Sequence, residues 1–105
     1  MTIPEITADE LATIIEEGGR VIDVREPFEF TEARVPGART VPLATVPQHI
    51  DDFRSDGTTY VICRSGARSM QACEFLTAQG VDVANVEGGM IAWIASGRDV
   101  VSGPT

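Results

Sequence analysis

Short apolar runs alternate along the chain with segments whose apolar residues recur at helical spacing. The runs that predict strands are Ile3–Ile6, Arg20–Val24, Thr40–Pro42, Thr59–Cys63 and Val81–Val86. The segments that predict helices are Ala8–Glu17, Glu26–Phe30, Leu43–Phe53, Arg68–Gln79 and Met90–Ser96. The alternation predicts an α/β fold of three layers: an about five-stranded, mostly parallel sheet with helices on both faces. Functional side chains then gather beyond the carboxyl ends of the strands.

Several element boundaries carry their own signals. Thr7 precedes the first helix, and Glu10 follows three residues later, which predicts a capping box. Pro27 suits the first turn of the second helix. The last residues, Ser102–Thr105, predict a frayed end.

The most apolar strand ends at a cysteine, Cys63, and the segment Arg64-Ser65-Gly66-Ala67-Arg68-Ser69 follows at once. A loop of this kind can turn backbone N–H groups toward the sulfur, and the next helix adds its positive N-terminal end. Such surroundings lower the pKa of a cysteine from about 8.5 to the range of about 3.5–7.5 and produce a reactive thiolate. The competing interpretation is a buried core cysteine. A core cysteine needs no flanking guanidinium groups, so the two arginines favour the thiolate.

The charge balance makes Arg64 and Arg68 stand out. The net charge is −8, so nucleic acid is not an expected partner. All eight basic residues are arginine, which excludes a lysine Schiff base. Two of these eight positive charges flank one sulfur, and we therefore expect the loop to bind an anion.

Size and composition remove several other classes of protein. A chain of 105 residues predicts a single domain, residues 1–105. One histidine and two cysteines cannot assemble a plausible zinc site, and no metal is expected. We see neither a secretory signal nor an apolar run that could span a membrane, so we expect a cytoplasmic protein with free thiols and no membrane partner. Cys73 lies on the apolar side of its predicted helix and is expected to be core filler rather than a resolving thiol.

Four segments, in order and suitably spaced, resemble the motifs of the single-domain rhodaneses, which are sulfurtransferases. The resemblance covers nearly the whole chain. The segments are Ile22–Phe30, the turn Val35-Pro36-Gly37-Ala38, the loop Cys63–Arg68, and Val86–Trp93 with its Glu-Gly-Gly element. Ala33-Arg34 departs from the Gly-His usual in the family, which we expect to affect local packing rather than activity. The loop has the form Cys-x4-Arg, whereas related phosphatases and arsenate reductases use Cys-x5-Arg to surround a larger oxyanion.

The resemblance and the local physics imply the same chemistry: a thiosulfate sulfurtransferase of the rhodanese type that works by a ping-pong route and needs no cofactor. The Cys63 thiolate takes sulfur from a small anionic donor, thiosulfate or a small persulfide, and passes it from a cysteine persulfide to a thiol or cyanide. The expected binding residues are Arg64, Ser65, Gly66, Ala67, Arg68 and Ser69, whose N–H groups form an anion-binding nest. Whether Arg64 or Arg68 contacts the substrate stays open, because an arginine at the last position of the loop can instead tie the loop to the body of the protein.

Two other functions compete with this one. The first is a sulfur-relay or binding module that exchanges persulfide sulfur with a protein partner. The second is a phosphatase or arsenate reductase, which the short loop and the lack of a general acid after Arg68 disfavour.

The remaining polar residues are expected to be structural. An Arg25–Glu29 ion pair is predicted to support the loop after its strand, and Asp23 to accept hydrogen bonds from neighbouring loops. Ser69 is expected to cap its helix and Gly66 to adopt positive φ. Three further expectations concern a solvated His49, a structural Glu87, and core packing for Met90 and Trp93, with one end of Met90 near the pocket rim.

Overall fold

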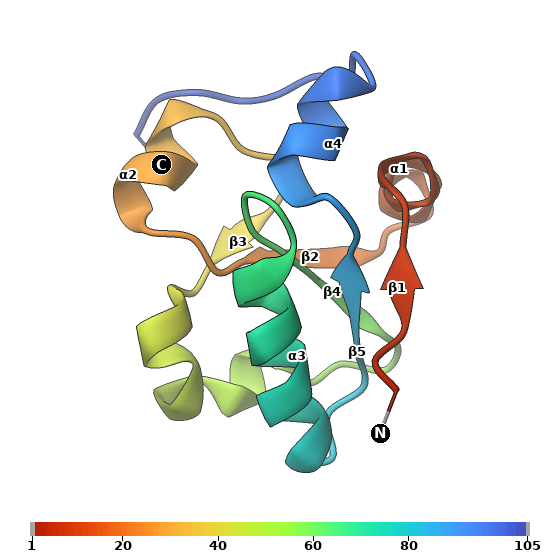
Figure 1. Ribbon diagram of the computed structural model, residues 1–105, viewed down its shortest axis with the longest axis vertical. Coiled ribbons are helices and arrows are strands. Elements are labelled where there is room, and N and C mark those ends of the chain that lie inside the picture. The colour runs from red at the N-terminus through yellow and green to blue at the C-terminus, as the bar shows by residue number, and fades with distance from the viewer. Residues whose placement is uncertain (1, 105) are drawn as a thin grey trace.

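The computed structural model describes residues 2–104 and contains one parallel sheet (Figure 1). The five strands stand in the order β1-β5-β4-β2-β3, and every neighbouring pair is parallel. Their bounds are β1 Glu5–Ile6, β2 Arg20–Asp23, β3 Arg39–Thr40, β4 Thr59–Ile62 and β5 Val83–Val86. The strand that precedes Cys63 is therefore central, with a strand on each side. Among residues 2–104, no helix is both long and apolar enough to cross a membrane.

Helices cover both faces of the sheet, as predicted. Their bounds are α1 Ala8–Glu16, α2 Pro27–Glu32, α3 Ala67–Ala78 and α4 Gly89–Ala95. On one face, α3 packs Ala72, Cys73 and Leu76 against Ile22 and Val61 of the sheet. On the other face, α1 and α4 enclose a second cluster that includes Leu11, Met90 and Trp93. The core positions of Met90 and Trp93 were thus predicted correctly.

The capping box of α1 forms as its sequence indicates. The Thr7 hydroxyl accepts the backbone N–H of Glu10 at 3.1 Å, and the Glu10 carboxylate accepts the N–H of Thr7 at 2.9 Å. Two of the four N–H groups left free at the start of a helix are satisfied in this way. Local chemistry alone therefore sets the start of α1.

The predicted helix over Leu43–Phe53 is wrong. The segment forms two short 3₁₀ helices, Leu43–Gln48 and Ile50–Phe53. Pro47 has no N–H to donate to an α-helical hydrogen bond, which favours the shorter 3₁₀ turns. Val46 and Phe53 are nevertheless buried, so the apolar spacing identified the core residues without identifying the helix type.

The predicted frayed end is also wrong for Ser102 and Gly103, while Thr105 lies outside the described residues. The backbone N–H of Gly103 donates to the carbonyl of Thr31 at 2.8 Å, and Arg34 donates to the carbonyl of Gly103 at 2.7 Å. Arg34 also forms an antiparallel bridge with Val101 and lies 4.9 Å from the Phe30 ring centroid. The departure at Ala33-Arg34 therefore supplies a side chain that holds the C-terminal segment on α2.

Candidate active site

Cys63 lies directly after the central strand, at the carboxyl edge of the sheet, and is 1% exposed. In Figure 1 the loop after β4 lies beyond the strand ends, and α3 begins there at Ala67, one residue earlier than predicted. Gly66 is the residue before α3 and has φ +106, as expected. A side chain at this φ is strained, and its Cβ would lie 3.4 Å from the backbone nitrogen of Gly88. A glycine at this position therefore allows the loop to close tightly around the sulfur.

Two hydrogen bonds reach the sulfur of Cys63. The backbone N–H of Gly66 donates to Sγ at 3.1 Å, and the Ser69 hydroxyl lies 3.2 Å from Sγ. Burial acts to raise the pKa of the Cys63 thiol, but hydrogen bonds from the Ser69 side chain and from the N–H groups of Ser69, Gly66 and Ser65 outweigh it. The pKa is therefore lowered, and the sulfur is prepared to react as a thiolate.

Ser69 does not cap α3, contrary to our expectation. It is fully buried one turn into the helix, where its hydroxyl faces Cys63 and Asn85. A serine near a helix start usually suggests a cap. The signal that could have identified this role is the spacing of six residues between Cys63 and Ser69. In a strand followed by a tight loop and a helix, the first turn of the helix lies beside the end of the strand.

The start of α4 closes the other side of the loop. The N–H of Met90 donates to the carbonyl of Cys63 at 2.9 Å, and the N–H of Ile91 donates to the carbonyl of Arg64 at 3.1 Å. A Cβ on Gly89 would clash with the Cys63 carbonyl oxygen. Gly89 thus permits a contact between α4 and the loop backbone that a larger residue would block.

The two loop arginines have different surroundings. Both terminal nitrogens of Arg68 donate to the carboxylate of Glu29 in α2, at 2.7 and 2.9 Å. The hydrogen bond from Arg68 lowers the pKa of Glu29 to about 2. Arg64 is exposed, and its side chain forms no hydrogen bond or ion pair with residues 2–104. Arg68 thus ties the loop to α2, while Arg64 is available to an anion.

The predicted Arg25–Glu29 ion pair is wrong. Arg25 pairs instead with Asp23, at 2.7 Å, and both side chains are almost completely buried. Arg25 also donates to the carbonyl of Ala33 at 2.7 Å. Asp23 is thus a structural acceptor, and the Asp23–Arg25 pair stabilises the chain between β2 and α2.

The other loop residues lie at the surface of the protein. Ser65 and Ala67 are exposed, and a cavity of about 230 Å³ lies beside Arg64. Met90, Ile91 and Ile94 of α4 line the apolar side of this cavity. The cavity beside the loop therefore combines the cation of Arg64 with an apolar wall and with the carboxylate of Glu32.

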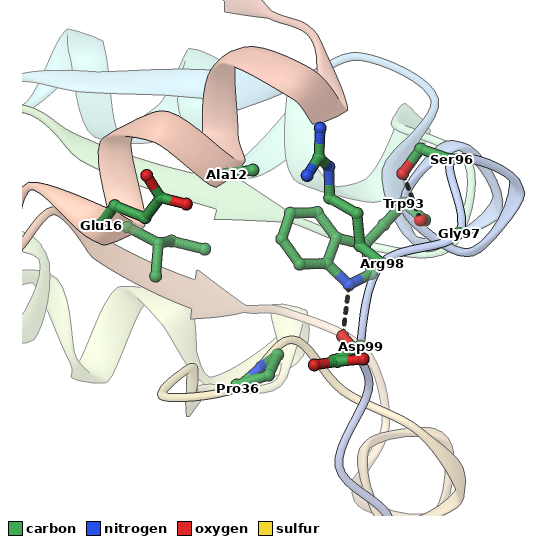
Figure 2. A pocket seen from close by; sticks show the side chains of 9 residues that line it. Ala12, Glu16, Pro36, Trp93, Ser96, Gly97, Arg98 and Asp99 are labelled. Atoms are coloured by element: carbon green, nitrogen blue, oxygen red, sulfur yellow. Dashed lines mark hydrogen bonds between the residues drawn. The ribbon is translucent and has the colours of Figure 1, made fainter.

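A second cavity, of about 400 Å³, lies between α1 and the chain that follows α4 (Figure 2). The Trp93 indole N–H donates to the carbonyl of Asp99 at 2.9 Å, and Arg98 pairs with Asp9 at 2.8 Å. Its lining includes no residue of the loop Cys63–Ser69, whereas the cavity beside α4 is lined by Arg64 of that loop. This cavity is therefore not the candidate active site.

The remaining predicted residues stand apart from the sulfur chemistry. Cys73 is buried in the core, where burial and then the nearby charge of Cys63 raise its pKa to about 12. His49 has a half-exposed side chain that lies 3.0 Å from the carboxylate of Asp52. Glu87 is exposed. Among residues 2–104, no three His, Cys, Asp or Glu side chains are grouped as a metal site.

Comparison with known proteins gives a consistent result. The family model described as the rhodanese-like domain matches residues 7–96. A Bacillus subtilis protein with a provisional sulfurtransferase name, YtwF, is 41% identical over 95 residues, which cover 89% of this chain and 92% of that protein. The thiosulfate sulfurtransferase GlpE of Pseudomonas putida is 36% identical over 81 residues, or 76% of this chain and 74% of that protein. A rhodanese-related protein from Thermoplasma volcanium superimposes with a TM-score of 0.87 at 35% identity, covering 93% of this chain and 97% of that structure.

Proposed function

The chain belongs to the rhodanese-like domain family, and from this premise we propose that it is a sulfurtransferase that carries sulfur as a persulfide on Cys63. The observation that carries the proposal is the convergence of the Gly66 N–H and the Ser69 hydroxyl on one buried sulfur whose pKa is lowered. A thiolate is the nucleophile that sulfur transfer requires.

In the first half-reaction, the Cys63 thiolate attacks the outer sulfur of thiosulfate. A sulfur–sulfur bond to Sγ forms, the bond between the two thiosulfate sulfurs breaks, and sulfite leaves with that electron pair. The cysteine persulfide then carries one negative charge on its outer sulfur. N–H groups of Ser65, Gly66 and Ser69 contribute to lowering the pKa of the Cys63 sulfur, and groups in that position support a persulfide anion as well.

In the second half-reaction, an acceptor thiolate or cyanide attacks the outer sulfur. The bond from Sγ to that sulfur breaks, and the thiolate of Cys63 is regenerated. No general base is needed, because both nucleophiles react as anions. The loop of six residues from Cys63 to Arg68 supports sulfur as the transferred group over phosphate or arsenate.

An anionic donor is favoured by Arg64, whose charge has no ion-pair partner among residues 2–104. The positive charge of Arg68 is neutralised by Glu29, and that of Arg25 by Asp23. Of these three arginines, Arg64 is thus the one without a carboxylate partner among residues 2–104, which suits an anionic donor such as thiosulfate or a small persulfide. The name of the Pseudomonas putida relative supports thiosulfate as the donor. The two free thiols are consistent with the reducing cytoplasm, where we place the protein.

The direct test is the intact mass of the protein after incubation with thiosulfate and gel filtration. We expect a gain of one sulfur atom on the wild type and on Cys73→Ser, and no gain on Cys63→Ser. Subsequent cyanide should remove the added sulfur and release thiocyanate. Retention of sulfur by Cys63→Ser would contradict the proposed function.

A second candidate is a relay module that receives its sulfur from a protein. It is favoured by Ile91 and Ile94, which are 49% and 54% exposed beside the cavity. Exposed apolar side chains at a site entrance suit a macromolecular surface. Slow turnover with thiosulfate, together with rapid discharge of the Cys63 persulfide to a carrier protein, would favour this relay.

A further inference from the structure

Behind the loop lies a buried polar side chain that the proposed chemistry does not use. Asn85 is 1% exposed, and its neighbours in β5 are apolar and buried. Burial of an amide is unfavourable unless its polar atoms are hydrogen-bonded. The contacts of Asn85 therefore determine how its side chain is oriented.

Two acceptors orient the amide of Asn85. Its nitrogen donates to the carboxylate of Glu5 at 3.0 Å and to the carbonyl of Gly66 at 3.2 Å. Glu5 and Asn85 are paired in register between β1 and β5, which run side by side in Figure 1. A carboxylate and a carbonyl can only accept, so a flipped amide would place oxygen against oxygen at both contacts. The amide oxygen must therefore face Ser69, with which it forms a short hydrogen bond.

Ser69 consequently has more acceptors than protons. Its single hydroxyl proton has three acceptors within reach: the Asn85 amide oxygen, Cys63 Sγ at 3.2 Å and the Gly66 carbonyl at 3.3 Å. A hydroxyl donates one full hydrogen bond at a time. Donation to the sulfur therefore requires that Ser69 give up its bond to Asn85.

We propose that Asn85 is a positioning residue. Its amide oxygen accepts the hydrogen bond of the Ser69 hydroxyl when Sγ is uncharged, and loses this hydrogen bond to Sγ when Sγ is an anion. This role rests on the proposed function, because sulfur transfer moves the negative charge between Sγ and the outer sulfur of the persulfide. In the free enzyme the hydroxyl donates to the Sγ thiolate. In the persulfide, Sγ is neutral and the hydroxyl turns to Asn85. The hydroxyl only rotates, so no proton leaves Ser69.

The consequence of this competition between Asn85 and Sγ is that the Cys63 thiolate is stabilised only moderately. Nucleophilicity falls as the pKa of a thiol falls, with a Brønsted coefficient of about 0.4–0.5. Asn85 competes with Sγ for the hydrogen bond from the Ser69 hydroxyl. This competition keeps the thiolate reactive and lowers the barrier to the step that moves the negative charge from Sγ to the outer sulfur. A merely structural Asn85 would act in the opposite direction, because a disordered loop loses the hydrogen bonds that support the thiolate.

The test is the rate of Cys63 alkylation by iodoacetamide as a function of pH, in a Cys73→Ser background. For Asn85→Leu we expect the profile to move toward lower pH, with the ionisation constant increased about tenfold and the plateau rate reduced about threefold. Ser69→Ala should move the profile toward higher pH, and Asn85→Leu should have no further effect in that background. A shift toward higher pH in Asn85→Leu, or the same shift with and without Ser69, would overturn the proposal.

A surface variant guards against misfolding of Asn85→Leu. A glutamine at position 5 can donate as well as accept, so in Glu5→Gln only the Gly66 carbonyl still orients the amide of Asn85, and a smaller shift toward lower pH is expected. Glu87→Gln removes the same charge from an exposed position and serves as the control. An identical shift in both glutamine variants would mean that only net charge matters, and would overturn the proposal.

The charged and titratable groups on the elements around the loop are Glu5, Asp23, Arg25, Glu29, Arg64, Arg68, Cys73 and Glu87. All of them are unchanged in Asn85→Leu, so they do not account for the expected shift of its alkylation profile. Alkylation needs no sulfur donor. A profile that shifts as expected in a protein that gains no sulfur from thiosulfate would therefore support the role of Asn85 while contradicting the proposed function.

Discussion

The ion pair between Arg68 and Glu29 should stabilise the folded protein measurably. The pKa of Glu29 is lowered from 4.5 to about 2, chiefly by the hydrogen bond from Arg68. At about 1.4 kcal/mol per pKa unit, this corresponds to an upper limit of roughly 3 kcal/mol. The Arg68 side chain is 35% exposed, so solvent screening reduces the expected coupling to about 1–2 kcal/mol.

A double-mutant cycle measures this coupling. Glu29→Gln, Arg68→Met, the double variant and the wild type are unfolded in urea at pH 7 and at pH 3. Because the pKa of Glu29 is lower in the folded state, its stabilisation is complete above pH 4.5 and is lost as the pH falls through 2. The coupling at pH 3 should therefore be less than half of that at pH 7.

The matched control is the exposed ion pair between Arg98 and Asp9, whose side chains are 36% and 77% exposed. Its cycle should give no more than about 0.5 kcal/mol. A Glu29–Arg68 coupling as small as that of the control, or one that does not change between pH 7 and pH 3, would refute the reasoning.

Three further predictions concern the loop and the core. Arg64→Ala should raise KM for thiosulfate about threefold and KM for a monoanionic thiosulfonate by less, because the Coulomb energy scales with the charge of the donor. Equal increases of the two KM values in steady-state assays would contradict the binding of an anionic donor by Arg64. Cys73 should resist iodoacetamide at pH 8 in the folded protein and react in urea, because burial raises its pKa to about 12; peptide mapping that finds native Cys73 alkylated would count against its assignment to the core. Gly89→Ala should lower the free energy of unfolding by about 1–3 kcal/mol and slow the alkylation of Cys63. Gly97→Ala is the control, because the space around its Cβ is open, and it should leave the alkylation rate unchanged. A wild-type urea midpoint for Gly89→Ala would be inconsistent with the close contact at Cys63.

The elements that could be predicted from the sequence depend on local chemistry. The apolar run before Cys63 predicted a strand, and the Thr7–Glu10 pair predicted the start of α1. Local chemistry also explains the wrong helix type at Leu43–Phe53. The apolar spacing correctly indicated which residues are buried, but Pro47 favoured 3₁₀ turns over an α-helix.

The partners of the charged residues could not be predicted because they depend on tertiary structure. Arg25 and Glu29 are four residues apart, a spacing that suggests an ion pair when both lie in one helix. Arg25 precedes α2, however, and turns back to Asp23, while Glu29 faces the loop after β4 and meets Arg68. Separations of 39 residues, as between Glu29 and Arg68, leave no trace in a local pattern.

The same holds for the network behind the sulfur. Glu5 and Asn85 lie 80 residues apart and meet because β1 adds to the edge of the sheet next to β5. A single sequence contains no periodic signal for this meeting. Asn85 itself was visible only as a polar residue within an apolar strand.

The central position of β4 also has a consequence for folding. The environment of Cys63 requires β4, the first turn of α3 and the start of α4 together, and none of these segments can supply it alone. The enhanced reactivity of this thiol at low pH should therefore appear late in refolding, after the long-range strand pairings have formed. A short pulse of alkylating reagent at mildly acidic pH would then count native molecules in a refolding mixture, with no need for a substrate.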